Sequence, residues 1–312
     1  MRILITGGFG YLGLWLADYF YKKKYEICIL SKRIKNNPIK IPCKIIEADI
    51  TNLKQLKSEL KDKYDYCLHT ASINDQFIKN YDKKALLVNA LGTRNIIEAL
   101  NECNKLNRFI YFSTFHVYGK YNGIINENMK FNPYSDYAST HLFAEYYLKQ
   151  FYNLYKFPYT TVRLTNCYGA PKHINSTKWY LVLNDLAKMA YEQGEIVLNS
   201  NGTVRRDFIW IGDVCSIVHK LLKAKNTIND SFLVSSEKTL IMNDIAEIVK
   251  KVYEKRYNKK VRIYVNKDDR TVYDANVFVS NKKLKSVIKF NIHDNLYNEV
   301  NEIFSLLEKN VE

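Results

Sequence analysis

Three glycines near the N-terminus have the spacing of a turn that binds the phosphates of a dinucleotide. They stand in Thr6-Gly7-Gly8-Phe9-Gly10-Tyr11-Leu12-Gly13, directly after a strand-like run at 2–6 and at the start of a helical pattern. The first glycine permits a tight turn, the second lets a pyrophosphate approach the backbone, and the third lets the helix pack on the sheet. The helix start then offers unpaired N–H groups and partial positive charge to the phosphates. The residues expected to contact the dinucleotide here are Gly7, Phe9, Gly10, Tyr11, Leu12 and Gly13.

The residues after the next predicted strand bear on the choice between NAD and NADP. An acidic residue that binds the ribose 2′-hydroxyl of NAD is expected about 20 residues after the glycines. The chain has Ser31-Lys32-Arg33 there, and a serine flanked by cations could bind the 2′-phosphate of NADP. Lys32 and Arg33 could equally be surface charges, with a main-chain contact that holds NAD. Both cofactors therefore remain open.

The elements that must position these residues alternate between short apolar runs and helical patterns. Strands are expected at 2–6, 26–30, 44–47, 65–69, 108–113 and 159–164, and helices at 12–23, 53–60, 84–104 and 138–154. This alternation is typical of an α/β fold with a parallel sheet covered on both faces. After Gly169 the pattern loosens, with a strand at 207–211 and helices at 213–224 and 242–254.

The expected fold is therefore a Rossmann-type doubly wound parallel sheet with a smaller C-terminal part. We expect the dinucleotide-binding domain at 1–168, with segments of about 204–235 returning to it. Residues 169–312 would mainly form the substrate-binding part, which closes over a cleft.

Composition excludes several other classes of protein. The 312 residues are 47% hydrophobic and 25% charged, which are ordinary globular values. The sequence has no run of about 18 apolar residues, the length needed to span a membrane. The chain runs from Met1 directly into a strand, so we expect a cytoplasmic protein without a signal peptide. The six cysteines are scattered, with no metal-ligand spacing. The net charge of +15 is mostly dispersed lysine, so nucleic acid is not an expected partner.

Seven segments between residues 48 and 214 match, in order, the motifs of one enzyme family. They are Ala48-Asp49-Ile50, His69-Thr70-Ala71-Ser72, Val88-Asn89-Ala90-Leu91-Gly92-Thr93-Arg94-Asn95, Ser113-Thr114-Phe115-His116-Val117-Tyr118-Gly119, Tyr137-Ala138-Ser139-Thr140-His141, Arg163-Leu164-Thr165-Asn166-Cys167-Tyr168-Gly169 and Arg206-Asp207-Phe208-Ile209-Trp210-Ile211-Gly212-Asp213-Val214. Together they resemble the extended short-chain dehydrogenase/reductase family, specifically its NAD-dependent sugar-nucleotide epimerase/dehydratase branch. The resemblance runs from residue 1 to about 220.

The resemblance implies further cofactor contacts. Asp49, beside Ile50, would contact the adenine. The segment His69-Thr70-Ala71 would line the cofactor at the end of the fourth strand, and Asn89 would brace the central strands. Helices 84–104 and 138–154 pair across a dimer interface in this family, so a homodimer is expected.

The resemblance assigns catalysis to Tyr137 and Thr114. Tyr137 would act as general base or acid on a sugar hydroxyl, and Thr114 would hydrogen-bond the same oxygen during hydride exchange with the nicotinamide. Because a tyrosine with an ordinary pKa near 10 is a poor base at neutral pH, the family has a lysine one helical turn further on. This chain has His141 at that position. Tyr137 and His141 are also expected to contact the cofactor.

Three interpretations of His141 stay open. A protonated His141 could do the work of the lysine, the oxidised nicotinamide could supply the positive charge, or catalysis could be slow or lost. The retained Thr114 and Tyr137 favour a working enzyme. If His141 is charged, the rate should show a limb near pH 6–7 that His141→Ala removes.

The residues after Thr114 bear on the reaction. The 4,6-dehydratases of this branch carry an Asp-Glu pair there, whereas this chain has Phe115-His116, so dehydration is not expected. C4 oxidation, C4 epimerisation and keto-sugar reduction remain. His116 could pair with His173 as acid and base, or each could be a cleft-wall or surface residue.

A forked guanidinium matches the oxygens of a nucleotide diphosphate. Arg206 has motif support for this contact. Arg270 rests on position alone and could be a surface charge. The expected substrate contacts are Thr114, Phe115, His116, Asn166, Arg206 and Arg270.

The leading hypothesis is an NAD(P)-dependent enzyme that acts at C4 of a nucleotide-activated sugar. The resemblance implies a place in bacterial surface-polysaccharide synthesis. The alternatives are an NADPH-dependent keto-sugar reductase or epimerase-reductase, and a non-catalytic dinucleotide-binding regulator, which His141 keeps open.

Overall fold

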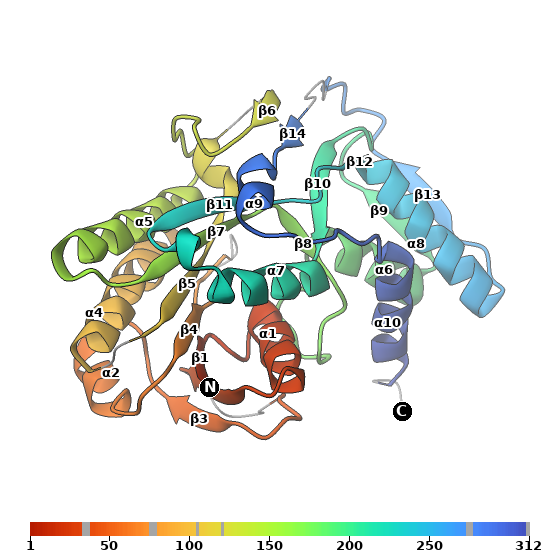
Figure 1. The fold of residues 1–312 in the computed structure, drawn as a ribbon. Helices are drawn as coiled ribbons and strands as arrows, with labels where there is room; N and C mark the ends of the chain where they lie inside the picture. The colour runs from red at the N-terminus through yellow and green to blue at the C-terminus, as the bar shows by residue number, and fades with distance from the viewer. Residues whose placement is uncertain (33–37, 75–79, 104–105, 120–121, 273–276, 310–312) are drawn as a thin grey trace.

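A seven-stranded parallel sheet forms the centre of the molecule (Figure 1). The computed structural model describes residues 1–32, 38–74, 80–103, 106–119, 122–272 and 277–309. The strand order is β11-β7-β5-β4-β1-β2-β3, and every neighbouring pair is parallel. The strands are β1 (Arg2–Thr6), β2 (Glu26–Ser31), β3 (Lys44–Glu47), β4 (Tyr66–His69), β5 (Arg108–Thr114), β7 (Tyr159–Leu164) and β11 (Asp230–Val234). The predicted Rossmann-type doubly wound sheet is therefore confirmed.

The central strands read as continuous apolar runs because helices cover both faces of the sheet. All seven residues of β5 are buried. One face carries α1 (Tyr11–Lys22) and α7 (Ile211–Lys223), which pack together with the short helix α9 (Lys282–Val287) on one apolar core. The other face carries α2 (Leu53–Glu59), α4 (Thr93–Cys103) and α5 (Asp136–Tyr155) on a second core.

The helix predicted at 84–104 is three consecutive segments rather than one. They are α3 (Tyr81–Ala85), the π-helix η1 (Leu86–Gly92) and α4. Within η1, the buried side chain of Asn89 accepts from the Ile73 N–H at 2.8 Å and donates to the Ile73 carbonyl at 3.1 Å. Asn89 also donates to Thr140 Oγ1 at 3.1 Å. The wider π turn thus accompanies contacts to the loop after β4 and to α5, which helical periodicity does not reveal.

The chain after β7 builds a smaller C-terminal part with its own core. Helices α6 (Val182–Gln193), α8 (Met242–Tyr257) and α10 (Leu296–Glu308) pack together there. Two small sheets accompany them. One contains β8 (Asn166–Tyr168), β10 (Arg205–Trp210) and β12 (Thr239–Ile241), and the other β9 (Glu195–Leu198) and β13 (Arg262–Val265). A further sheet pairs β6 (Gly123–Ile125), which precedes β7, with β14 (Val277–Val279). Two 3-10 turns are η2 (Phe115–Tyr118) and η3 (Lys225–Thr227).

Two elements of the later chain lie in the layers of the main sheet. Strand β11 pairs with β7 at the sheet edge, and α7 packs on α1. In Figure 1 these elements stand beside the N-terminal half, while α6, α8 and α10 stand apart on the right. Within the described ranges, no helix combines the length and apolar character needed to cross a bilayer.

Candidate active site

A cavity of about 730 Å³ opens where the carboxyl ends of the central strands meet the C-terminal part. Its walls come from the residues that follow β1, β4, β5 and β7, from the start of α5, and from the segment that leads into α6. Open α/β sheets bind their ligands at this edge, where the strand order reverses. The reversal here lies between β1 and β4.

The glycine turn forms the floor of the cavity and leaves no room for side chains. Gly7 has φ of +66°, and a Cβ there would lie 2.7 Å from the Cα of Ala71. A Cβ on Gly13 would lie 2.5 Å from the carbonyl oxygen of Gly7. Gly10 precedes α1, which has no side-chain cap and no acidic residue in its first turn. The N–H groups at the start of α1 are therefore available to hydrogen-bond a pyrophosphate, so the residues at this turn fit a bound dinucleotide.

Other predicted cofactor residues gather around this turn. Tyr11, Leu12 and Thr70 line the cavity with Gly10 and Gly13. The Tyr11 hydroxyl donates a hydrogen bond to the carbonyl of Gly169, which ties the turn to the loop after β8.

Three other predicted contacts, His69, Phe9 and Ile50, are not among the described residues that line the cavity. His69 is buried between the hydroxyls of Thr6 (2.7 Å) and Thr93 (2.9 Å). Phe9 packs against the apolar core beneath α1 and α7. The Ile50 side chain packs against Gly92, since a Cβ there would lie 2.7 Å from its Cδ1.

The predicted cation at the end of β2 is paired. Lys32 Nζ lies 2.6 Å from Asp49 Oδ2, and this ion pair, with hydrogen bonds from Thr51, lowers the pKa of Asp49 against the effect of burial. Ser31 is the last residue of β2. Arg33 lies outside the described residues.

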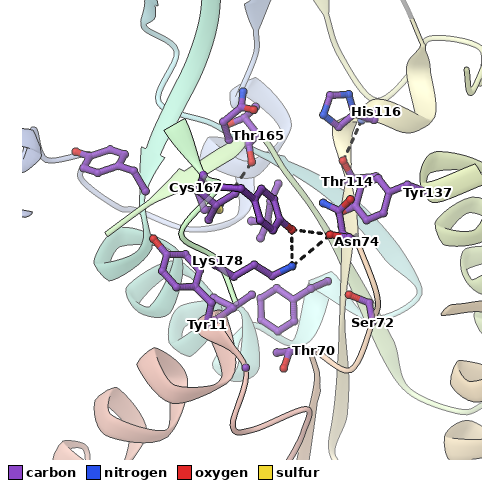
Figure 2. A pocket seen from close by; sticks show the side chains of 18 of the residues that line it. Tyr11, Thr70, Ser72, Asn74, Thr114, His116, Tyr137, Thr165, Cys167 and Lys178 are labelled. Carbon is purple, nitrogen blue, oxygen red and sulfur yellow. Dashed lines mark hydrogen bonds between the residues drawn. The ribbon is translucent and has the colours of Figure 1, made fainter. Parts of the chain in front are cut away.

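Tyr137 and Thr114 meet in the cavity (Figure 2). Thr114 is the last residue of β5, and Tyr137 is the second residue of α5. The start of α5 is fixed by Ser135, whose Oγ accepts from the Ala138 N–H at 3.2 Å. Burial raises the pKa of the Tyr137 phenol, and a hydrogen bond with Thr114 opposes that rise. The two hydroxyls therefore form one polar unit, with the phenol protonated at neutral pH.

His141 lies one turn further along α5, against Tyr137. The two ring centroids are 4.5 Å apart at an interplanar angle of 71°. Burial lowers the pKa of His141 to about 3, with a smaller effect from His116. The interpretation in which a protonated His141 replaces the family's lysine therefore disagrees with the structure, because a buried imidazole without an acidic partner stays neutral. The rate limb expected from it near pH 6–7 falls with that interpretation.

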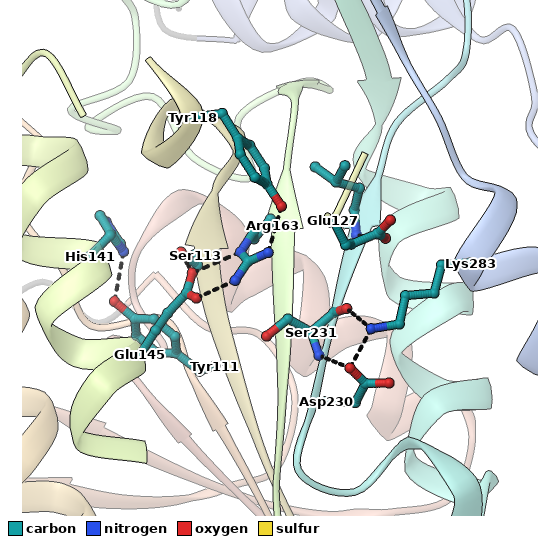
Figure 3. Close-up of polar contacts among 11 residues, drawn as sticks. Tyr111, Ser113, Tyr118, Glu127, His141, Glu145, Arg163, Asp230, Ser231 and Lys283 are labelled. Atoms are coloured by element: carbon teal, nitrogen blue, oxygen red, sulfur yellow. Dashed lines mark hydrogen bonds and ion pairs between the residues drawn. The ribbon is translucent and has the colours of Figure 1, made fainter. Parts of the chain in front are cut away.

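A buried ion pair anchors α5 to the sheet (Figure 3). Glu145 receives two hydrogen bonds from Arg163 of β7, at 3.0 and 2.6 Å, and a third from Ser113 Oγ at 2.6 Å. Arg163 also donates to the Tyr118 hydroxyl at 2.6 Å. Because Glu145 is one turn after His141, this network fixes the helix that carries Tyr137.

The far wall of the cavity holds part of the predicted substrate set. Arg206, Asn166 and His116 line it. Asn166 donates to the Asp207 carbonyl at 2.9 Å, which fixes its amide. Burial, together with the charge of Arg206, lowers the pKa of His116 to about 4.

Three predicted residues lie elsewhere. Phe115 is buried in a small core with Val117 and Leu142. Arg270 is exposed on the segment after β13. Phe115, Arg270 and His173 are not among the described residues that line the cavity, so the structure does not bring His116 and His173 together as an acid–base pair.

The structure adds cavity residues that the sequence did not indicate. Lys178 Nζ donates to the Tyr180 hydroxyl at 2.7 Å and to the Asn74 carbonyl at 3.4 Å (Figure 2). These contacts join the C-terminal part to the loop after β4 across the cavity. Asn184 also lines the cavity, as does Ser72, the last residue of the matched segment 69–72. Lys178 and Asn184 belong to no spacing pattern, since a lone lysine in a loop gives no signal until the fold brings it inward.

Within the described ranges, no group of three or more His, Cys, Asp or Glu side chains could hold a metal ion. The fold is that of a dinucleotide-binding Rossmann protein, and Tyr137 lines its cavity. A family model described as the NAD dependent epimerase/dehydratase family matches residues 3–234. The chain belongs to that family, as the resemblance in the sequence indicated.

Individual relatives and structures are similar over most of the chain. The "Putative UDP-glucose 4-epimerase" of Methanocaldococcus jannaschii is 28% identical over 85% of this chain and 89% of its own. The dTDP-D-glucose 4,6-dehydratase of Dictyostelium discoideum is 26% identical over 79% of this chain and 61% of its own. The structure of UDP-glucuronic acid 4-epimerase from Bacillus cereus, in complex with UDP-glucuronic acid and NAD, has a TM-score of 0.80 at 20% identity, covering 99% of both chains.

Proposed function

We propose that this protein is an NAD-dependent enzyme that exchanges hydride at C4 of a nucleotide-activated sugar, most simply as a C4 epimerase. The observation that carries this proposal is the hydroxyl pair of Tyr137 and Thr114, which faces the same cavity as the glycine turn. The relatives named above act, by their names, on UDP- or dTDP-sugars, and a role in surface-polysaccharide synthesis would follow from such a substrate.

The chain's own residues would act as follows. The N–H groups at the start of α1 bind the dinucleotide phosphates, and NAD supplies a hydride acceptor and donor when bound. In its ionised form Tyr137 takes the proton of the sugar hydroxyl onto Oη and later returns it, while Thr114 Oγ1 hydrogen-bonds the same oxygen. Arg206, at the far wall, binds the diphosphate and so fixes which sugar carbon faces Tyr137.

The cavity argues against elimination of water. A 4,6-dehydration needs an acid and a base beyond Tyr137, and η2 offers only Phe115, which is buried, and His116. Burial and the charge of Arg206 lower the pKa of His116 to about 4. A neutral imidazole of such low basicity is a weak substitute for a carboxylate pair.

Reaction in D2O with UDP-, dTDP- and GDP-hexoses, followed by proton NMR, tests the proposal. C4 epimerisation by hydride exchange gives the C4 epimer without deuterium. Elimination across C5 and C6 exchanges the C5 hydrogen, because a C4 ketone acidifies it. Tyr137→Phe should abolish turnover and leave dinucleotide binding intact.

Two other functions predict different results. A keto-sugar reductase would consume one reduced cofactor per product and would show no epimerisation. A non-catalytic regulator would bind dinucleotide, turn over none of the sugars, and lose nothing in Tyr137→Phe.

We propose NAD rather than NADP as the cofactor. The carboxylate of Asp49 neutralises Lys32, the described cation at the end of β2. A 2′-phosphate would meet that carboxylate as well as the ammonium, so the pair offers it little net attraction.

We also propose a homodimer through η1 and α5, which pack side by side. Leu86, Leu87 and Leu91 of η1 and Phe143 and Tyr146 of α5 are between 38 and 53% exposed. Such neighbouring apolar side chains on two helices fit an isologous contact with a second copy. Light scattering should show a dimer that Leu87→Asp dissociates, whereas Ile124→Asp on β6 should leave it intact.

A further inference from the structure

We propose that Tyr111 is a positioning residue that holds His141 in the tautomer with the proton on Nε2, so that an N–H donor points into the cavity beside Tyr137. This inference rests on the proposed function for its consequence in catalysis. Its structural part, the tautomer, does not depend on any substrate.

The geometry comes from two different elements of the Rossmann part. Tyr111 lies on β5, and its hydroxyl is 2.7 Å from His141 Nδ1 (Figure 3). Both side chains are 2% exposed. The other ring nitrogen, His141 Nε2, is buried and has no hydrogen-bond partner among the described residues. His141 lines the cavity, and Nε2 is the ring nitrogen without a hydrogen bond to the described residues, so we infer that it serves a ligand or Tyr137.

The position of the ring proton follows from the donor strengths. His141 is neutral, because burial holds its pKa at about 3, and it therefore carries one ring proton. A phenol is a good donor and a poor acceptor, whereas an imidazole nitrogen is a good acceptor. The Tyr111 O–H therefore donates to Nδ1, and the single ring proton stays on Nε2.

Thr93 is the competing acceptor for the Tyr111 proton, since its hydroxyl lies within hydrogen-bonding reach of that phenol. Thr93 donates its own proton to the Asn89 carbonyl at 2.5 Å, and its oxygen faces His69 Nε2 at 2.9 Å. That oxygen is already occupied and is a weaker acceptor than an imidazole nitrogen. If Tyr111 donated its proton to Thr93 instead, the ring proton of His141 would lie on Nδ1 and be donated to Tyr111.

The groups around His141 also keep it uncharged. The carboxylate one turn further along α5, Glu145, is taken by Arg163 and Ser113. The contacts of the His141 ring are with the rings of Tyr137 and Tyr111. With no acidic partner, the imidazole acts as a neutral donor.

A donor at Nε2 suits the work at this position. It can hydrogen-bond a ribose hydroxyl or the ionised oxygen of Tyr137, and so favour the tyrosinate without a buried cation. The reverse tautomer would place a lone pair there, which repels a tyrosinate. Tyr111 thus supports Tyr137 through His141 and touches no reacting atom.

The test is nitrogen-15 NMR of histidine-labelled protein with NAD alone, recorded between pH 5 and 8. His141→Gln identifies the His141 signals among the six histidines. We expect a protonated Nε2 and a hydrogen-bonded, unprotonated Nδ1 across the whole range. A proton on Nδ1, or a signal that titrates within this range, overturns the proposal. This result needs no substrate, and the His141→Gln variant serves only to assign the signals.

A variant pair tests the consequence. In Tyr111→Phe the Nδ1 signal should move to the position of a nitrogen without a hydrogen bond. The kcat should fall about tenfold, the scale of one lost hydrogen bond, with KM for the nucleotide sugar changed less than twofold. The matched control Tyr66→Phe removes another buried phenol of the same sheet and should change neither. An unchanged Nδ1 signal in Tyr111→Phe contradicts the proposal. No turnover in the unmodified protein would instead refute the proposed function and leave the tautomer result standing.

Discussion

Replacing His141 with lysine should restore a positive charge beside Tyr137. In the unmodified protein burial raises the pKa of Tyr137, and the nearest ring, His141, is neutral. Only the ionised phenol can accept the proton of a sugar hydroxyl, so the rate of sugar oxidation should climb with pH through the neutral range.

The size of the effect follows from the spacing of the two rings. Their centroids are 4.5 Å apart, so an ammonium at position 141 would stand about 5 Å from the phenol oxygen. At an effective dielectric constant of about 20 this gives roughly 3 kcal/mol, or about two pKa units. Desolvation of the ammonium reduces this electrostatic stabilisation. The pKa of Tyr137 should therefore fall by one to two units.

The assay is the single-turnover rate of sugar oxidation by bound NAD against pH, read from the transient absorbance of the reduced nicotinamide. In His141→Lys the rising limb should move to lower pH by one to two units, and the rate at pH 7 should increase about 10- to 100-fold. In the neutral control His141→Gln the limb should stay where it is. A folded His141→Lys protein with an unmoved limb would refute the electrostatic argument.

Three further changes have definite expected results. Glu145→Ala leaves Arg163 buried without its partner and should lower the free energy of unfolding by about 3–5 kcal/mol, measured by urea denaturation; a loss under about 1 kcal/mol would mean that the pair does not anchor α5. Asp49→Asn frees Lys32 and should raise the affinity for NADP relative to NAD, measured by calorimetry. An unchanged ratio of the two affinities would mean that the 2′ position of the cofactor's ribose does not lie beside Lys32. Lys178→Met should raise KM more than it lowers kcat, since this lysine lines the cavity and hydrogen-bonds Tyr180 and Asn74. A fall in kcat larger than the rise in KM would assign Lys178 to the chemical step.

The fold could be predicted because its signals are local. Each central strand is a short apolar run of β-branched and aromatic residues, and the observed limits of β1, β3 and β7 equal the predicted ones. The glycine turn could be predicted because its conformation depends on residues that are close in sequence, and Gly7, expected to permit a tight turn, has φ of +66°. The membership in the epimerase/dehydratase family followed from seven motifs in order.

The site was less predictable because its properties depend on burial and on distant partners. The sequence shows a histidine at position 141 and cannot show that it is enclosed and bonded to Tyr111. Lys32 reads as a free cation until the fold brings Asp49 to it. Phe115 follows Thr114 in the motif, yet the turn of η2 directs its ring into a core. Lys178 lies in a loop without periodicity, and only the packing of the C-terminal part brings it to the cavity.

The most direct test of the central claim is calorimetric titration of NAD into the purified protein, after any bound nucleotide has been removed. The account predicts one saturable site per chain. Gly13→Val should abolish binding, because a side chain there meets the carbonyl of Gly7 at the start of α1. Absence of binding to the folded, unmodified protein at millimolar NAD, or full binding by Gly13→Val, would contradict it.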